Sequence, residues 1–209
     1  MSVVIIAYPP GAGGNHLKNM LLMSREFENS HELNLDNYNN GNREVHSTPG
    51  RNIEEYKLVQ SKNATQDYLL HGHFGELAPW RNQLQEINKK FVIITMNTVI
   101  DLQLVARRQE RMGQQCHPYW LHEEQPHLYQ PHLYSSYFNT PEENLHCVSV
   151  YDLWHPTLCK QQVLEQLDTF LGGNIDHAEA LELQKKWWTS NFMFDFSEFE
   201  QKLYNYIKL

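Results

Sequence analysis

The first 23 residues constrain the fold of this chain more than any other stretch. An apolar, β-branched run at residues 3–7 ends at two prolines, and a glycine-rich stretch at residues 11–14 follows. Apolar residues at helical spacing resume at Leu17. Glycine permits positive φ and the close approach of a phosphate to the backbone, and a helix N-terminus adds N–H donors. The pattern therefore predicts a strand, an anion-binding loop and a helix.

The predicted anion site lies in this loop and in the first turns of the helix. Its candidate residues are Gly11, Ala12, Gly13, Gly14, Asn15, His16 and Lys18. Either His16 or Lys18 could bring positive charge to the bound anion. Two standard nucleotide motifs are not matched, because no Lys-Ser or Lys-Thr follows Gly14 and His16 stands where a dinucleotide fingerprint needs its third glycine. A structural turn is the alternative, although three glycines in four positions exceed what a plain turn requires.

Composition and charge restrict the class of protein. The 209 residues suffice for one domain with a central sheet. A net charge of −8 argues against nonspecific nucleic-acid binding, which relies on a basic surface. The three cysteines are too few for a disulfide framework, and no apolar stretch reaches the roughly 18 residues that a membrane span needs. We expect a cytoplasmic protein that binds neither nucleic acid nor a membrane, and the sequence leaves the oligomeric state open.

Strands alternate with helices along the chain. The predicted strands lie at residues 3–7, 67–71, 91–96 and 145–150, and the predicted helices at 76–88, 99–112, 157–171, after Asp176 and at 197–207. This alternation predicts an α/β fold, a single-domain three-layer α/β/α architecture with a mostly parallel central sheet, P-loop-like in type. A polar, asparagine-rich stretch at residues 29–63 is interpreted as an excursion or lid, and residues 114–144 as a long irregular loop.

Polar residues follow the predicted strands at the point where each one ends. They are the glycine loop, His71 and His73, Asn97, and Tyr151 with Asp152. Ligands of parallel α/β sheets lie at the carboxyl ends of the strands. We therefore expect these groups to gather at one edge of the sheet.

Five short segments of the chain, taken in their order along the sequence, resemble motifs of the sulfotransferases that use 3′-phosphoadenosine 5′-phosphosulfate (PAPS). The segments are Tyr8-Pro9 with the glycine loop, His71-Gly72-His73-Phe74, residues 91–96 with Asp101, Val150-Tyr151-Asp152-Leu153, and Phe170-Leu171-Gly172. The family's counterparts are Tyr-Pro-Lys-Ser-Gly-Thr-Thr, Lys-Thr-His, the strand before Arg-Asn-Pro-x-Asp, Tyr-Glu-Asp-Leu and Phe-Leu-Gly. The likeness touches most of the chain.

The resemblance implies an activity and a set of roles. It implies transfer of a sulfonate from PAPS to a hydroxyl or amine of a small-molecule or glycan acceptor, with no metal ion. It makes His73 the catalytic base, a role that suits an imidazole with an ordinary pKa near 6.5. His71, two residues earlier, is the weaker candidate for that role. A structural histidine at a strand end is the alternative.

The chain departs from the family at the positions that carry charge. Pro10 or Gly11 occupies the place of the loop lysine, Asn97 that of the arginine on the 3′-phosphate, and Val105 that of a serine one turn later. Arg107 and Arg108 lie nearby in the sequence and could supply this charge from a shifted position, with planar donors suited to phosphate.

Two other functions stay open at this level. One is a nucleotide kinase with a divergent loop, for which Asp101 or Asp152 would be the magnesium carboxylate. The missing Lys-Ser/Thr makes this alternative weaker. The other is a non-catalytic protein that keeps the fold for nucleotide binding or assembly, an alternative that the lost lysine, arginine and serine favour.

Histidines recur every five residues in the predicted irregular loop. They are His117, His122, His127 and His132, with Cys116, Glu123 and Glu124 nearby. A metal site is conceivable, but a five-residue spacing aligns with neither a helix nor a strand, and the prolines favour extended turns. The interpretation we prefer is a loop that packs over the sheet and shapes the acceptor pocket.

Overall fold

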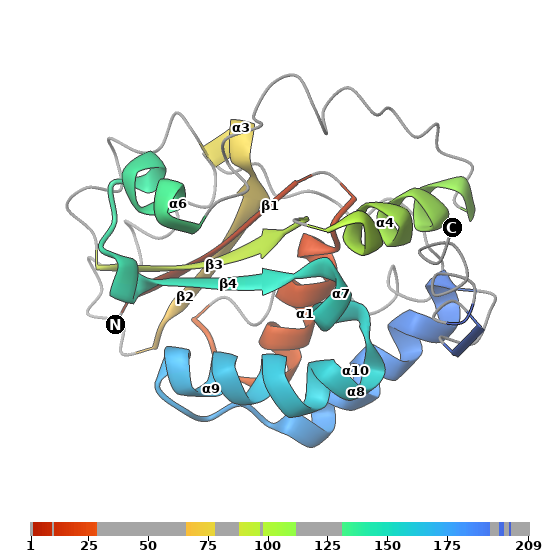
Figure 1. Cartoon of the computed structure of the whole chain (residues 1–209). Coiled ribbons are helices and arrows are strands. Elements are labelled where there is room, and N and C mark those ends of the chain that lie inside the picture. Colours follow the sequence, from red (N-terminus) through yellow and green to blue (C-terminus); the bar gives the residue numbers. More distant parts are fainter. Residues whose placement is uncertain are drawn as a thin grey trace.

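A parallel β-sheet forms the centre of the chain in the computed structural model (Figure 1). The structure describes residues 2–9, 11–28, 66–77, 88–96, 98–111, 131–192, 197–198 and 201. Its four strands are β1 (Val3–Tyr8), β2 (Tyr68–His73), β3 (Lys89–Thr95) and β4 (Leu145–Ser149). They are ordered β2-β1-β3-β4, and every neighbouring pair is parallel.

The strand register places the ends of the strands side by side. Tyr8, the last residue of β1, pairs with His73, the last residue of β2. Thr95 at the end of β3 pairs with Ser149 at the end of β4. The segments that follow the strands therefore start from one edge of the sheet, as the sequence predicts.

Helices cover both faces of the sheet (Figure 1). On one face lie α1 (Gly14–Ser24), α9 (Glu165–Leu171) and α10 (His177–Asn191), and on the other lie α3 (Phe74–Leu77) and α6 (Pro131–Phe138). Alternate residues of β1 enter the two cores, since Val4 and Ile6 belong to one cluster and Val3 and Ile5 to the other. The α/β architecture with a parallel sheet and helices on both sides is confirmed.

Two helices follow the last two strands of the sheet. They are α4 (Val99–Arg111), after β3, and α7 (Val150–Trp154), after β4. The buried Asp101 carboxylate joins their starts, because it accepts from the Thr98 amide at 2.9 Å and from the Tyr151 amide at 2.7 Å. Asp101 and Thr98 also form a reciprocal capping box, in which the Thr98 hydroxyl accepts from the Asp101 amide at 3.1 Å.

The predicted helix at residues 157–171 is present as one continuous helical run. It consists of α8 (Pro156–Leu158), the π-helical segment η4 (Cys159–Leu164) and α9. Gly172 ends it in the left-handed conformation at φ 90°, where its amide and that of Gly173 both donate to the Asp168 carbonyl. The helix predicted after Asp176 is α10, and the Asp176 side chain caps it.

The prediction of an irregular loop over residues 114–144 is wrong for its last part. Residues 131–138 form α6, and Glu142–Asn144 forms the 3₁₀ helix η3. Pro131 is the first residue of α6, a position where proline is tolerated because its missing N–H has no helical partner there. Tyr134 and Phe138, one helical turn apart, are buried and stack on Phe74 and Phe91, respectively.

Some predicted segments lie outside the described residues. They are the excursion at residues 29–63, most of the helices at 76–88 and 197–207, Asn97, and the histidines His117, His122 and His127. Within the described ranges, no helix has the length and apolarity needed to cross a lipid bilayer.

Candidate functional site

The glycine loop leaves the central strand β1 and turns directly into α1. The Ala12 amide donates to the Pro9 carbonyl at 3.1 Å, which closes the first turn. Gly11 and Gly13 adopt φ values of 81° and 86°, in the left-handed region that favours glycine. The Leu17 amide then donates to the Gly13 carbonyl at 3.0 Å as the helix begins. The predicted sequence of strand, glycine loop and helix is confirmed as a structure.

The N-terminus of α1 carries no side-chain cap and no acidic residue in its first turn. Helix α7 is capped by Ser149 and α10 by Asp176. The first amides of an α-helix have no carbonyl within the helix, and the helix dipole adds positive potential at this end. The start of α1 therefore has the backbone donors and the potential of an anion site.

Two aromatic side chains leave no room for a Cβ atom at Gly13 and Gly14. A Cβ atom on Gly13 would lie 2.7 Å from Nε1 of Trp154, and one on Gly14 would collide with the ring of Tyr8. Both aromatic residues are buried. Glycine is therefore required at these positions by packing, at Gly13 in addition to its φ angle. The sequence suggested no role for Trp154, which no local pattern connects to the loop.

Arg108 brings a cation to the loop from α4. Its Nη1 donates to the Gly11 carbonyl at 3.3 Å, and its Nε donates to Oδ1 of Asn191 at 3.0 Å. The guanidinium also lies over the Trp187 ring, 5.7 Å from its centroid. Arg107, the other arginine that the sequence analysis proposes as a source of positive charge, is exposed. Arg108 thus contacts the loop directly.

The surroundings of His16 do not support a role for it as a cation at the loop. It is buried, stacks on Trp187 with ring centroids 4.3 Å apart, and donates from Nε2 to Oε1 of Gln184. The Gln184 amide nitrogen donates to the carbonyls of Leu153 and Trp154, so its oxygen is the acceptor. Burial lowers the pKa of His16 to about 3 and outweighs the hydrogen bond to Gln184, which raises that pKa, and the charge of Arg108 lowers it further. The imidazole is neutral at physiological pH. Lys18, one turn along α1, is also buried.

The buried His16 makes the stability of the protein depend on pH. Below pH 6.5 the unfolded chain binds a proton on this residue that the native state does not bind, so stability is complete above that pH and declines toward about pH 3. We expect the free energy of unfolding to fall by about 2 kcal/mol between pH 7 and pH 5. Urea titrations at the two pH values measure this loss.

Replacement of the histidine tests the cause. His16→Gln should remove most of this pH dependence, whereas His177→Gln, on a partly exposed histidine, should retain it. A smaller slope remains in His16→Gln, because burial also lowers the pKa of His146. An unchanged slope in His16→Gln would contradict the assignment.

Tyr8 connects the loop to the histidines at the end of β2. Its hydroxyl donates to Oδ1 of Asn15 at 3.2 Å and lies 3.5 Å from Nδ1 of His71. The rings of Tyr8 and His73 meet edge to face, with centroids 4.9 Å apart. His71 is buried and His73 is partly exposed. The structure thus brings His73, the predicted base, next to the residue from which the loop starts.

The two carboxylates of the kinase alternative differ in their surroundings. Both oxygens of Asp101 accept hydrogen bonds from the protein, and its side chain is fully buried. Asp152 is partly exposed near the start of α7. Asp101 therefore serves the packing of α4 against α7, as described above.

Metal and thiol chemistry find no support in the described part of the chain. No group of three or more histidine, cysteine, aspartate or glutamate residues there could hold a metal ion. Burial raises the pKa of the Cys147 thiol to about 11 and that of Cys159 to about 12. Both thiols are protonated at neutral pH and are poor nucleophiles.

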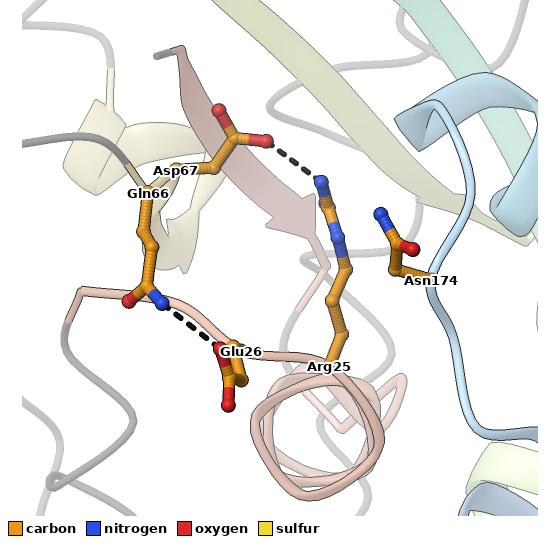
Figure 2. Close-up of a pocket in the computed structure, with 5 residues that line it drawn as sticks. All are labelled: Arg25, Glu26, Gln66, Asp67 and Asn174. Carbon is orange, nitrogen blue, oxygen red and sulfur yellow. Dashed lines mark hydrogen bonds and ion pairs between the residues drawn. The ribbon is translucent and has the colours of Figure 1, made fainter.

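A polar cavity of about 490 Å³ lies where β2 begins, away from the glycine loop (Figure 2). It is lined by Arg25, Glu26, Gln66, Asp67 and Asn174. Arg25 and Asp67 form an ion pair at 2.8 Å, and Gln66 donates to Glu26 at 3.0 Å. The Asp67 carboxylate also accepts from the amide and hydroxyl of Ser2. These contacts tie the end of α1 to the start of β2.

No protein-family model matches the sequence, and neither does any curated protein sequence. Solved structures similar to this chain include a sulfotransferase domain from the curacin biosynthetic pathway, with 16% sequence identity and a TM-score of 0.48 over 99% of this chain and 97% of that domain. Another is the sulfotransferase domain of the Synechococcus PCC 7002 olefin synthase, with 16% identity and a TM-score of 0.49 over 87% of this chain and 76% of that one.

Proposed function

We propose that this protein is a sulfotransferase-like enzyme that moves a sulfonate group from PAPS to a hydroxyl or amine. The observation that carries the proposal is the start of α1, an uncapped helix N-terminus that follows two positive-φ glycines at the end of the central strand. Arg108 adds a cation at the same loop. Backbone amides and a guanidinium are the groups that bind a phosphosulfate.

The proposed reaction is an in-line displacement at sulfur. The acceptor oxygen or nitrogen forms a bond to the sulfonate sulfur while the bond from sulfur to the bridging phosphate oxygen breaks, and adenosine 3′,5′-bisphosphate leaves. His73 takes the proton of the acceptor at a ring nitrogen. The amides of α1 and Arg108 stabilise the charge on the transferring group, so the reaction as proposed uses no metal ion.

The other predicted site residues keep distinct parts in this proposal. The loop residues Gly11, Ala12, Gly13 and Gly14 contact the 5′-phosphosulfate through their backbone. Arg107, exposed on the same helix as Arg108, is the proposed partner of the 3′-phosphate. The acceptor is proposed to be a small molecule or a glycan, and the protein to act in the cytoplasm.

Ligand binding to two arginine variants tests the proposal. We expect adenosine 3′,5′-bisphosphate to bind more tightly than adenosine 5′-monophosphate, because only the first has a 3′-phosphate. Arg108→Gln should weaken both ligands by about ten-fold to one hundred-fold, the effect of one lost charge-assisted hydrogen bond. Arg107→Gln should weaken the bisphosphate alone. Isothermal titration calorimetry measures all six affinities.

The nucleotide affinities also distinguish the proposed sulfotransferase function from the nucleotide kinase alternative. Equal affinity for both nucleotides in the unmodified protein would contradict PAPS as donor, and protection against thermal unfolding by ATP only with magnesium would favour the kinase. Far-UV circular dichroism of each variant confirms that the fold is intact.

A non-catalytic nucleotide-binding protein on the same fold is the second candidate. The observation that favours it is the buried, neutral His16, which leaves the loop without the charge that a lysine would provide on its own segment. This candidate shares the binding results above and differs in turnover. The His73 variants in the Discussion distinguish the two.

A further inference from the structure

Asn191 is a buried polar residue in an apolar part of the core. It is the last residue of α10, and only 7% of it is exposed. Phe192, which follows it, and Trp187, one turn earlier, both belong to the apolar cluster on this face of the sheet. An amide among such side chains is unfavourable unless its donor and its acceptor are hydrogen-bonded. The hydrogen bonds of Asn191 therefore indicate why an amide stands there.

Both ends of the Asn191 amide are engaged, and together they fix its orientation. Nδ2 donates to the Trp187 carbonyl at 2.9 Å, and Oδ1 accepts from Nε of Arg108 at 3.0 Å. The flipped amide would place a donor against Nε, which is itself a donor. Nη1 of the same guanidinium donates to the Gly11 carbonyl at 3.3 Å. The guanidinium is therefore held between the end of α10 and the glycine loop.

The groups of Asn191 and Gly11 that accept from Arg108 are uncharged. A carboxylate at position 191 would form a charge-assisted pair with the guanidinium and offset its charge, whereas an amide oxygen accepts the same hydrogen bond without doing so. The Trp187 ring, 5.7 Å from the guanidinium, is also neutral. The charge of Arg108 lowers the pKa of His16, which is buried in the first turn of α1. The positive charge thus acts at the start of α1.

We infer that Asn191 is a positioning residue that aims Arg108 at an anion bound by the glycine loop, and that it does so without adding a counter-charge. Its hydrogen bond from Nε sets the direction of the guanidinium, and its neutrality preserves the attraction for the anion. Asn191 acts through Arg108 and does not touch the ligand. The inference rests on the proposed function for the identity of that ligand, a nucleotide with a 5′-phosphosulfate.

Two substitutions at position 191 separate the two parts of this role. Asn191→Asp keeps an acceptor for Nε of Arg108 but adds a negative charge, whereas Asn191→Leu, of similar size, removes the acceptor. We expect Asn191→Asp to weaken the binding of adenosine 3′,5′-bisphosphate by about 30-fold, because the new ion pair offsets the charge of the guanidinium. Asn191→Leu should weaken it by about five-fold, because Arg108 keeps its charge but loses its orientation. Titration calorimetry measures these affinities.

The stability of the two variants should follow the opposite order. Both lose the hydrogen bond to the Trp187 carbonyl, but Asn191→Leu also removes the acceptor of Nε, which Asn191→Asp replaces by an ion pair. Urea unfolding should therefore show the lower midpoint for Asn191→Leu. A residue that served packing alone would give the reverse result, since leucine suits an apolar core and a carboxylate does not.

Two controls separate the contact with Arg108 from the added charge. Asn174→Asp makes the same chemical change at an exposed residue of the polar cavity, away from the loop, and should alter the affinity by about two-fold or less. In an Arg108→Gln background, Asn191→Asp should weaken the bisphosphate by only about three-fold or less, because no guanidinium is left to offset.

Inorganic pyrophosphate, tested on the same variants, provides an anion without a nucleoside. Pyrophosphate binding that weakens in the same order, with no binding of adenosine 3′,5′-bisphosphate, would refute the proposed function and support the role of Asn191. Unchanged affinity in Asn191→Asp, an equal effect of this substitution in the Arg108→Gln background, or a larger loss of affinity in Asn191→Leu would overturn the inference. Failure of the unmodified protein to bind either anion would overturn both proposals.

Discussion

Replacing His73 with glutamine should lower the turnover of PAPS by about 100-fold or more, the usual contribution of a general base. Affinity for adenosine 3′,5′-bisphosphate should stay within about three-fold, because His73 contacts the acceptor in the proposed reaction and leaves the loop intact. Release of the bisphosphate from PAPS, followed with a panel of phenol, alcohol and amine acceptors, measures the turnover.

His71→Gln is the matched control for this prediction. His71 is buried next to the Tyr8 hydroxyl, so its replacement should reduce the free energy of unfolding more than His73→Gln does. The two substitutions thus separate a role in turnover from a role in packing. Full activity in His73→Gln would eliminate His73 as the base. Binding of the bisphosphate without turnover on any acceptor in the panel would favour the non-catalytic candidate.

Gly13→Ala should reduce the free energy of unfolding by about 2–4 kcal/mol, because it combines a positive φ with a steric collision. The new methyl group would lie 2.7 Å from Nε1 of Trp154, which is fully buried and has little room to move. Chemical denaturation measures the loss. The substitution also displaces the loop, so anion binding should weaken together with stability.

Gly172→Ala isolates the backbone part of this effect. Gly172 has a similar φ of 90°, but no atom lies within 4 Å of the added Cβ. Its replacement should cost about 1–2 kcal/mol, the strain of a left-handed residue alone. In a Trp154→Phe background, which removes Nε1, the cost of Gly13→Ala should fall toward that of Gly172→Ala. A cost for Gly13→Ala no larger than that for Gly172→Ala would rule out the Trp154 contact as its cause.

Local signals in the sequence predicted the sheet and the position of the loop. Strands and helices show a characteristic spacing of apolar residues along the sequence, and glycine and proline mark where the chain turns. This is why β1, the loop and α1 were placed correctly from residues 3–23. The sequence predicts an irregular loop at residues 131–138 because its prolines favour extended turns, but Pro131 stands at the first position of α6, where proline is tolerated.

The neighbours of the loop could not be predicted in the same way. Arg108 contacts Gly11 across 97 positions of the chain, and His16 pairs with Gln184 across 168. A histidine in the first turn of a helix predicts a cation near the anion, but its neighbours on α10 bury it and lower its pKa. Contacts at such separations leave no periodic pattern in the sequence.

The sequence by itself determined that a glycine-rich loop follows the strand β1 and leads into a helix. Only the tertiary structure decided which side chains surround it, with Arg108 at the Gly11 carbonyl, Trp154 against Gly13, and Tyr8 on Asn15. The physical reason is that glycine conformations and helix starts are set by neighbouring residues. The charge, burial and hydrogen bonding of a side chain are set by residues that only folding brings close.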